Sequence, residues 1–384
     1  MVDEIRNGGI GHGLELRSLV SAEGTLELSL VEVPVPTPGT DEVVVRIEGA
    51  PINPSDLGLL VGPADLATLR AGGTPERPTL TADVPAKRLA SVTARLGESM
   101  PAGNEGAGTV IDAGEAARHL IGRTVAVLGG SMYAQYRVVK AAACLVLPEG
   151  TSARDGASAY VNPLTALAMV EVMRREGHTA LVHTAAASNL GQMLNRICLA
   201  DGVPLVNIVR SAEQATILRE IGAAHVVDST ADGFLDALTD MLEETGATLA
   251  FDAVGGGQLA GQIIGCMETA LNRKPGAYSR YGSATHKQVY IYGVLDMGET
   301  RIGRNVGMAW SVGGWLLTYF LARIAPEDAR RMRKRVADEL TTTFASRYTA
   351  EISLADALRP EMLAAYARRA TGAKYLINPS LDRV

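Results

Sequence analysis

Cysteine is scarce in this sequence, which contains only Cys144, Cys198 and Cys266 among its 384 residues. Cysteines so far apart along the chain provide neither a disulfide framework nor a CxxC metal site. Low cysteine content is typical of the reducing cytosol, where disulfides rarely persist. The N-terminal segment, MVDEIRNGG, also lacks the apolar run of a secretory signal. We therefore expect a cytoplasmic protein.

An excess of basic residues is missing as well, because the formal net charge is −6. A chain of this charge has no field that concentrates nucleic acid or anionic lipid, so we expect neither as a partner. The one basic cluster, residues 330–335, holds five Lys or Arg residues and is flanked by acidic residues at helical spacing. That pattern predicts the solvent-exposed face of a helix.

Long apolar runs are also few, and one uncharged run approaches the length of a membrane span: VGMAWSVGGWLLTYFLA, residues 306–322. It contains two adjacent glycines and lies late in an otherwise soluble-looking chain. These features favour a buried strand and helix, or a subunit interface, over a membrane span. We therefore expect no membrane partner.

What the sequence does contain is two kinds of periodic pattern. Residues 11–148 show short β-branched or alternating segments separated by Pro and Gly, which is typical of antiparallel strands in a barrel-like domain. From residue 153, apolar strands alternate with amphipathic helices, as in a doubly wound parallel sheet. Strand signals return near the end. We predict an α/β protein in which residues 1–155 and 344–384 form one domain and residues 156–343 the other.

The second domain yields predictions for individual elements. Strands are expected at residues 180–184, 205–209, 225–228, 249–253 and 289–292, and helices at 191–199 and 212–221. A further helix is expected at 360–369. In the first domain, residues 62–101 are rich in Pro, Thr and Ala and interrupt the strand pattern, so we interpret them as a lobe or lid.

A dinucleotide site is indicated by the strand, turn and helix that begin near residue 180. Small residues fill the turn and allow the backbone to approach a pyrophosphate, which the helix N-terminus attracts. Gly191 occupies the last glycine of the usual fingerprint, but Ala186 and Ser188 replace the first two. The motif alone is therefore weak, and its second strand adds the stronger signal.

That second strand ends at Val209, where an acidic residue would bind the ribose 2′-hydroxyl of NADH, and Arg210 follows it. A guanidinium at this point favours the 2′-phosphate of NADPH, and no carboxylate is present to repel the phosphate. The alternative is an ordinary surface arginine. We predict NADPH as the cofactor.

Several segments together resemble the medium-chain dehydrogenase/reductase superfamily, in its zinc-free quinone oxidoreductase and 2-enoyl thioester reductase branch. They are INPSD (52–56), GNEGAGTV (103–110), YVNPLTALAMVE (160–171), HTAAASNLGQ (183–192), FDAVGG (251–256) and YIYG (290–293), in family order. The resemblance implies a GroES-like β-barrel substrate domain, a Rossmann cofactor domain, a small-molecule substrate and a homodimer, for which residues 306–315 are a candidate interface.

The resemblance also implies the absence of zinc. Zinc-dependent members of the superfamily carry Cys where Asn53 stands and His where Asn104 stands, and amides are poor zinc ligands. The four-cysteine lobe of those enzymes is absent from the sequence as well. We therefore expect no metal.

Cofactor contacts follow from the same resemblance. Two helix residues are expected to face the nicotinamide, and the turn before the next helix is expected to bind the pyrophosphate. Arg210 and the serine after it are expected to bind the 2′-phosphate. A strand end, an apolar segment and a lysine near the C-terminus are expected to make the remaining cofactor contacts. For the apolar segment, core packing is an equal alternative. The expected residues are Asn162, Thr165, Ser188, Asn189, Leu190, Gly191, Arg210, Ser211, Tyr292, Gly293, Val294, Leu295, Trp315, Leu316, Leu317 and Lys374.

The reaction expected from the branch is hydride transfer to an activated C=C bond or a quinone, with a positioned acid to supply the proton. Enoyl reductases place a tyrosine shortly after the NPSD motif, but this sequence reads LGLLVGPAD there. Asn53 and Asp56 are the candidate catalytic residues: the amide of Asn53 can hold a substrate carbonyl, and Asp56 either assists or only fixes the loop. Tyr133 and Tyr136 are further candidates, with strand packing as their alternative.

Three functions remain open at this point. The first is an NADPH-dependent reductase of an activated C=C bond or a quinone. The second is a zinc-free alcohol or aldehyde oxidoreductase on the same fold. The third is a non-catalytic NADPH-binding protein, which the missing tyrosine favours.

Overall fold

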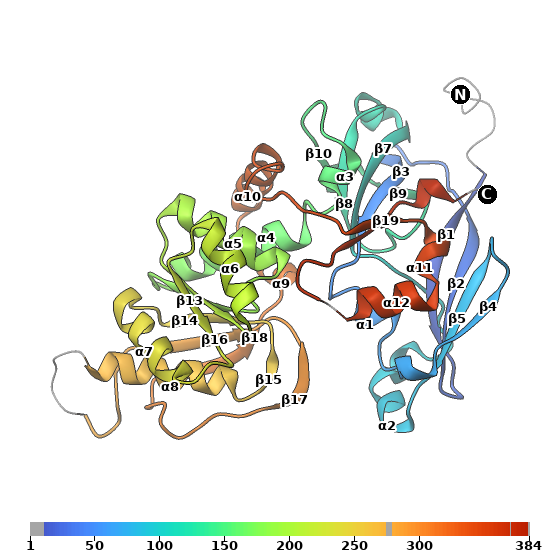
Figure 1. Ribbon diagram of the computed structural model, residues 1–384. Helices are drawn as coiled ribbons and strands as arrows, with labels where there is room; N and C mark the ends of the chain where they lie inside the picture. Colours follow the sequence, from blue (N-terminus) through green and yellow to red (C-terminus); the bar gives the residue numbers. More distant parts are fainter. Residues whose placement is uncertain (1–10, 274–278, 369, 383–384) are drawn as a thin grey trace. The chain divides into compact units, whose positions relative to one another are not determined.

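The computed structural model describes residues 11–273, 279–368 and 370–382. The chain divides into two compact units, which are coloured along the sequence in Figure 1. Unit 1 comprises the chain up to Val161 and again from Arg333, and unit 2 is Asn162–Met332. The chain thus passes between the units after residues 161 and 332. The sequence pattern instead predicted the domain boundaries after residues 155 and 343.

Unit 1 is built from two β-sheets. The first has the strand order β4-β5-β2-β1-β6, and the second β10-β8-β7-β3-β20-β19, with β9 also paired to β3. The strands of the first sheet are β1 (His12–Val20), β2 (Thr25–Pro34), β4 (Arg70–Gly73), β5 (Pro78–Asp83) and β6 (Met100–Pro101). Those of the second are β3 (Glu42–Pro51), β7 (Glu105–Ala113), β8 (Thr124–Leu128), β9 (Tyr136–Lys140), β10 (Cys144–Val146), β19 (Ala350–Ile352) and β20 (Tyr375–Ile377).

One hydrophobic core lies between the two sheets of unit 1. Alternate residues of both sheets point into it, among them Leu14 and Leu28 of the first sheet and Val45 and Val127 of the second. Backbone hydrogen bonds from residues 133–135 reach both β1 and β3, so this segment joins the sheets along one side. The predicted barrel-like domain of antiparallel strands therefore matches the structure.

Short helices fill the connections of unit 1. They are α1 (Leu57–Leu60), η2 (Leu66–Thr68), α2 (Ala86–Leu89), η3 (Ala90–Arg95), η4 (Glu115–Leu120), η5 (Ala141–Ala143), α3 (Ala153–Gly156), α11 (Leu354–Ala357), α12 (Pro360–Ala367) and η6 (Pro379–Leu381). The helix predicted at residues 360–369 corresponds to α12. The C-terminal segment returns to unit 1, because β20 pairs antiparallel with β3.

Residues 62–101 are not a separate lobe or lid, so that interpretation is wrong. Strands β4, β5 and β6 all come from this stretch and extend the first sheet. Leu80, Ala82 and Val84 of the stretch are buried in the core of the unit. The sequence pattern was obscured because β4, RAGG, is exposed along its whole length and so carries no apolar alternation.

Unit 2 contains a six-stranded parallel sheet with the order β13-β12-β11-β14-β16-β18. The strands are β11 (Leu181–Thr184), β12 (Leu205–Val209), β13 (His225–Asp228), β14 (Leu249–Asp252), β16 (Lys287–Ile291) and β18 (Trp310–Gly314). Since the first strand is central and the order reverses between β11 and β14, this is the doubly wound order of a Rossmann sheet. The predicted fold class is therefore confirmed.

Helices cover both faces of this sheet, with α5 and α6 on one side and α7 and α8 on the other (Figure 1). The helices are α4 (Val161–Arg175), α5 (Asn189–Asp201), α6 (Ala212–Ile221), α7 (Phe234–Thr245), α8 (Leu259–Arg273), α9 (Leu317–Leu321) and α10 (Pro326–Asp338). A short parallel pair, β15 (Gly255–Gly257) and β17 (Asp296–Thr300), lies outside the main sheet. The strand at 289–292 begins two residues earlier than predicted, and Tyr292 follows it.

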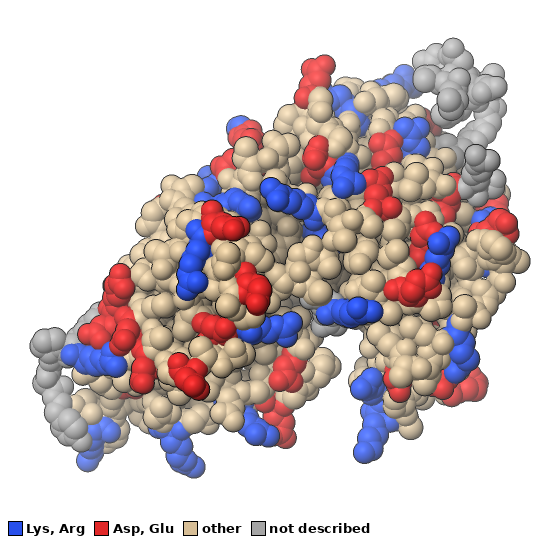
Figure 2. Space-filling view, in the orientation of Figure 1, with Lys and Arg blue, Asp and Glu red and all other residues tan. Residues whose placement is uncertain are grey.

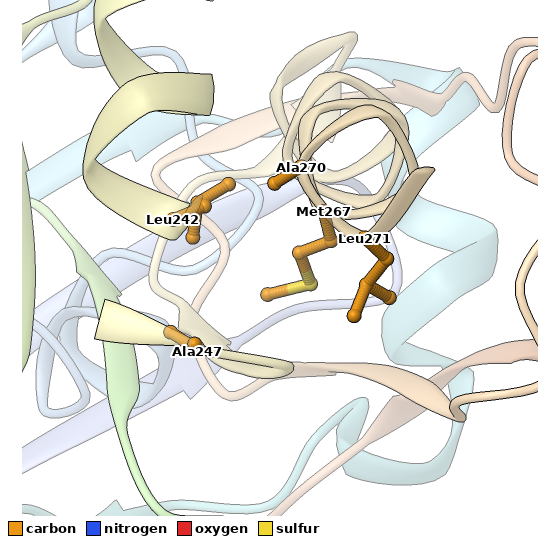
Figure 3. A pocket seen from close by; sticks show the side chains of 6 residues that line it. Leu242, Ala247, Met267, Ala270 and Leu271 are labelled. Atoms are coloured by element: carbon orange, nitrogen blue, oxygen red, sulfur yellow. The ribbon is translucent and has the colours of Figure 1, made fainter. Parts of the chain in front are cut away.

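Packing between α7, α8 and the sheet is tight. A gap of about 10 Å³ lies between α7 and α8. Figure 3 shows the side chains that line it, among them Leu242 of α7, Met267 and Ala270 of α8, and Ala247. Its lining is apolar, and a cavity of this size is at the lower limit for one water molecule. The gap is therefore a packing defect, not a ligand site.

The apolar run at 306–322 forms β18 and α9, as a strand and a helix were predicted. It is less buried than expected, because Met308 is 76% exposed and Tyr319 is 68% exposed. No helix in the described part of the chain is long and apolar enough to cross a membrane.

The basic cluster lies on α10, whose Met332 and Val336 are buried while most of its basic side chains reach solvent. Ion pairs join Arg331 to Asp328, Lys334 to Asp338 and Arg335 to Glu339. Acidic and basic side chains are interspersed on the face shown in Figure 2. The predicted solvent-exposed helix face is therefore present.

Candidate functional site

In unit 2, the C-terminal ends of β11 and β14 are tied together by a buried carboxylate. Asp252 accepts hydrogen bonds from the Thr184 hydroxyl at 2.6 Å and from the backbone N–H groups of Val254 at 2.9 Å and Gly255 at 3.0 Å. Thr184 Oγ1 in turn accepts from the Ala253 N–H at 2.8 Å. The bonds hold both strand ends at the point where the strand order reverses, which is where open α/β sheets bind ligands.

The turn after β11 has the geometry of a dinucleotide turn although two of its glycines are replaced. Ala185 has φ +50°, a left-handed conformation that is uncommon for alanine. The Ser188 hydroxyl caps α5 by accepting from the Gly191 N–H. A Cβ at Gly191 would lie 2.1 Å from the Ala186 carbonyl oxygen, so only glycine lets the helix pack this closely. Asn189 and Leu190 form the first turn of the same helix.

Arg210 directly follows β12 and is exposed. Its backbone N–H donates to Gln214 Oε1, but its guanidinium forms no hydrogen bond or ion pair with the described residues. Ser211 caps α6 by accepting from the Gln214 N–H. The unpaired cation and the N-terminus of α6 therefore present positive charge and donors side by side.

The predicted strand end beside the nicotinamide is held from within unit 2. The Tyr292 hydroxyl lies 2.7 Å from His183 Nε2, and the two rings are stacked. Burial lowers the pKa of His183 to about 3, so the ring is neutral at pH 7. A Cβ at Gly293 would lie 2.6 Å from the Ala253 carbonyl oxygen. Val294 and Leu295 are largely exposed, and the hydroxyl of Tyr292 is committed to His183.

The remaining predicted contacts of unit 2 differ in their surroundings. Trp315 packs edge-on against Phe251 with ring centroids 5.5 Å apart, so core packing accounts for it without a cofactor. Leu316 is exposed and Leu317 is buried. Asn162 and Thr165 lie in the first turns of α4 and are 8% and 6% exposed. The roles assigned to these residues stay predictions.

Unit 1 brings Asn53, Asp56 and Lys374 into one buried polar cluster. Asp56 accepts from the backbone N–H groups of Asn53 and Asn104, both at 2.8 Å, and so closes the loop between β3 and α1. Burial raises the pKa of Asp56 to about 7, with the nearby Glu105 carboxyl adding to the effect. Both carboxyl oxygens of Asp56 are occupied by this loop, which favours the loop-fixing role.

Glu105 is the centre of the cluster, and sequence reasoning missed it. Its Oε1 accepts from Asn53 Nδ2 at 2.8 Å, and its Oε2 accepts from the backbone N–H groups of Tyr160 and Val161 at the start of α4. Burial raises its pKa, while Lys374 and these hydrogen bonds act in the opposite direction. The available signal was a lone acidic residue inside the otherwise uncharged segment GNEGAGTV.

Two polar atoms of the cluster have no partner among the described residues: Asn53 Oδ1 and Lys374 Nζ. Because Asn53 Nδ2 donates to Glu105, the amide turns its oxygen, not its nitrogen, to the free side. Lys374 is 8% exposed, and burial lowers its pKa to about 8 against the attraction of Glu105 and Asp56. A buried donor and a buried acceptor left unpaired in one cluster indicate a place where a polar ligand or an ordered water binds.

The other tyrosine candidates are engaged in packing. The Tyr133 hydroxyl donates to the Pro51 carbonyl oxygen at 3.1 Å, and its side chain is fully buried. The Tyr136 ring lies against Gly13 of β1. Strand packing, the alternative given for both, is what the structure shows.

The side-chain amides of Asn53 and Asn104 each donate to a neighbouring side chain. Asn53 Nδ2 donates to Glu105, and Asn104 Nδ2 donates to Ser55 Oγ at 3.0 Å. Within residues 11–273, 279–368 and 370–382, no group of three His, Cys, Asp or Glu side chains is arranged to hold a metal.

No family model matches the chain, but comparisons with single proteins find relatives among reductases. The mitochondrial enoyl-[acyl-carrier-protein] reductase of Xenopus tropicalis is 27% identical over 212 residues, which are 52% of this chain and 51% of that protein. The quinone oxidoreductase of Pseudomonas aeruginosa is 28% identical over 158 residues, 40% of this chain and 48% of that protein. The chain thus matches about half the length of these two relatives.

The likeness of the folds covers much more of the chain. A Mesorhizobium loti protein assigned as an NADPH:quinone reductase aligns with 96% of this chain and 99% of its own, with a TM-score of 0.70 and 26% identity.

Proposed function

Because this chain belongs to the medium-chain dehydrogenase/reductase superfamily, among relatives that are quinone oxidoreductases and enoyl thioester reductases, we propose that it is an NADPH-dependent, zinc-free reductase. The substrate class we propose is a small molecule with a carbonyl-conjugated C=C bond or a quinone. The observation that carries the proposal is the unpaired Arg210 guanidinium beside the Ser211 cap of α6.

The residues of unit 2 fit the proposed cofactor. The close approach at Gly191 leaves no side chain between the backbone and a pyrophosphate, and Ser188 to Gly191 begin α5. Arg210 and Ser211 would hold the 2′-phosphate. Asn162, Thr165 and the strand end at Tyr292 would hold the nicotinamide. When bound, the reduced nicotinamide supplies a hydride.

Cofactor choice is tested by replacing Arg210. Arg210→Ala should weaken NADPH binding about 10- to 100-fold and leave NADH binding unchanged, because a charge-assisted hydrogen bond to phosphate contributes roughly 1.5–3 kcal/mol. Titration calorimetry with both dinucleotides measures the ratio. Arg219→Ala, at the other end of α6, is the matched control. If the ratio of the affinities for NADPH and NADH were unchanged in Arg210→Ala, Arg210 would be an ordinary surface residue.

Catalysis is tested by a screen of NADPH oxidation over enones, quinones, enoyl thioesters and aldehydes. Turnover of enones or quinones supports the proposal, and turnover of aldehydes alone supports an alcohol or aldehyde oxidoreductase. Binding of NADPH without turnover of any of them supports a non-catalytic NADPH-binding protein. One equivalent of tightly bound zinc in the active protein contradicts the zinc-free assignment.

The proposal includes a homodimer through residues 306–315. Strand β18 is the last strand of the six-stranded sheet, so its outer edge offers backbone donors and acceptors to a second copy. Met308 on this segment is 76% exposed. Light scattering should give twice the chain mass, and a monomer would contradict the assembly.

A further inference from the structure

Lys374 lies immediately before β20, at the place where the C-terminal segment meets the Asn53 loop. In the β20–β3 pair, Ile377 is opposite Ala50 and Leu376 is opposite Pro51, and the Ile52 N–H donates to the Tyr375 carbonyl oxygen at 2.9 Å. Lys374 and Asn53 lie just beyond the paired residues on the two segments, and both adjoin Glu105: Asn53 Nδ2 donates to it, and Lys374 acts on it electrostatically. The two unpaired atoms therefore belong to neighbouring side chains.

The charged groups around Lys374 stabilise its ammonium without binding it. The carboxyls of Glu105 and Asp56 both act on it electrostatically. Their oxygens already accept from Asn53, Asn104, Tyr160 and Val161, and neither carboxyl forms an ion pair with Lys374 among the described contacts. The Tyr348 ring lies 5.7 Å from Nζ, and Arg154 lies over the same ring. The donors of Nζ thus remain available to a ligand.

Other protic side chains near the cluster are already committed. The hydroxyls of Tyr133, Tyr160 and Tyr366 donate to the carbonyl oxygens of Pro51, Ala143 and Ala357, and the Tyr348 hydroxyl is paired with Ser158 Oγ at 2.8 Å. Residues 57–65, LGLLVGPAD, contain no tyrosine, and Leu57 and Leu60 are part of the core. None of these groups can serve as an acid without losing a hydrogen bond.

We infer that Lys374 is the residue that binds the carbonyl oxygen of the substrate and gives it a proton, and that Asn53 Oδ1 then accepts the resulting O–H. This assignment rests on the proposed function and makes Lys374 a catalytic residue for it. It differs from a cofactor contact because it places the ammonium at the oxygen of the substrate.

The protons and electrons balance as follows. Hydride addition to the conjugated system leaves an electron pair on the carbonyl oxygen, and the Nζ–H donor stabilises that oxyanion. The Nζ–H bond breaks, its electron pair stays on nitrogen, and the oxygen becomes an enol or hydroquinone O–H. The neutral amine of Lys374 regains a proton from water. Since burial lowers the pKa of Lys374 to about 8, the group is protonated at neutral pH and can release its proton readily.

The test compares Lys374→Met and Lys374→Arg with Lys140→Met, an exposed lysine on β9. A phenol dye, para-nitrophenol, mimics the product oxygen, and its absorbance reports how much phenolate is bound. The wild-type protein and the Arg variant should bind it as phenolate, with its apparent pKa lowered by about one unit or more, and the Met variant should lose the shift. The kcat of Lys374→Met should fall about 100-fold or more, with NADPH affinity changed less than threefold.

Each result has one meaning. An unshifted dye in the wild-type protein, or an unchanged kcat in Lys374→Met, overturns the assignment. A loss of NADPH affinity as large as the loss of kcat also overturns it, in favour of a cofactor contact. Absence of turnover in the wild-type protein contradicts the proposed function alone, because the dye measurement does not require NADPH. If the Met variant fails to fold, Lys374→Gln is compared in the same way.

Discussion

Two buried lysines, one in each unit, differ in whether the residues around them supply hydrogen-bond partners. Lys287 of unit 2 is fully buried and donates to Glu268 at 2.6 Å and to the Thr285 carbonyl oxygen at 3.3 Å. Lys374 of unit 1 is nearly as buried, and its Nζ has no hydrogen-bond partner among the described residues. The ammonium of Lys287 therefore has hydrogen-bond acceptors in the fold, and the ammonium of Lys374 has none among the described residues.

The carboxylates of the two units show the same contrast. In unit 2, the oxygens of Asp252 and the hydroxyl of Thr184 are bonded to groups that fix the ends of β11 and β14. In unit 1, Glu105 is equally engaged, but its neighbours Asn53 and Lys374 each keep one atom free. A fully bonded network rigidifies a fold, whereas unpaired buried atoms cost stability until a ligand arrives. The comparison predicts that replacing Lys287 lowers the free energy of unfolding and that replacing Lys374 raises it.

The largest change in the free energy of unfolding is expected from Lys287→Met. Glu268 would remain nearly buried without its cation, and breaking a buried pair from one side costs roughly 3–5 kcal/mol. Chemical denaturation should therefore show a large decrease in the free energy of unfolding. Lys140→Met, which removes an exposed pair with Asp41, should cost about 1 kcal/mol or less. Equal losses in the two variants would mean that the buried pair contributes no more than a surface pair.

A smaller effect of opposite sign is expected from Lys374→Met. Because burial lowers the pKa of Lys374 to about 8, the unfolded chain binds this proton more strongly than the native protein does. The ammonium therefore destabilises the native state below pH 8, and that cost fades as the pH rises towards the ordinary lysine pKa. Lys374→Met should raise the free energy of unfolding by about 2 kcal/mol at pH 7, and the gain should shrink by pH 10.

This prediction is checked by denaturant titrations of both proteins at several pH values. Lys140→Met serves again as the control. Hydrogen bonds to Asp41 and Glu42 raise the pKa of Lys140, so its small contribution to stability should stay nearly constant from pH 7 up to the ordinary lysine pKa and be lost only above it. A Lys374→Met variant that is less stable than the wild type at pH 7 would show that the ammonium has a partner in the native state. The unit 1 cluster would then be structural, like its counterpart in unit 2.

The sequence predicted unit 2 better than unit 1. Strands β12 and β13 and helix α6 were predicted with their observed bounds, because buried apolar strands alternate there with helices that have clear serine and glycine caps. Residues 62–101 were misinterpreted because their strands are short and partly exposed, so tertiary pairing with β2 and β1 decides their structure.

Single residues of the buried polar cluster could be named from the sequence, but their arrangement could not. Asn53, Asp56 and Lys374 were identified by their motifs, yet only the pairing of β20 with β3 brings the lysine to the Asn53 loop. A single sequence does not reveal such a long-range register. The same limit hid Glu105, whose importance depends on three donors from distant segments. It also hid the orientation of Asn53, whose amide oxygen is left unpaired while its nitrogen donates to Glu105.

The smallest effect is expected at Ala185, where the bonded network of unit 2 holds a strained turn. A left-handed alanine costs roughly 1–2 kcal/mol, and glycine would remove that strain but add about 0.5–1 kcal/mol of chain entropy. Ala185→Gly should therefore raise the free energy of unfolding by about 1 kcal/mol or less, seen as a higher denaturant midpoint with an unchanged slope. Ala186→Gly, at a buried neighbour without positive φ, should lower it by a similar amount. If both variants were destabilised alike, the turn at Ala185 would not be strained. The hydrogen bonds of Asp252 would then join the ends of β11 and β14 without holding a strained residue between them.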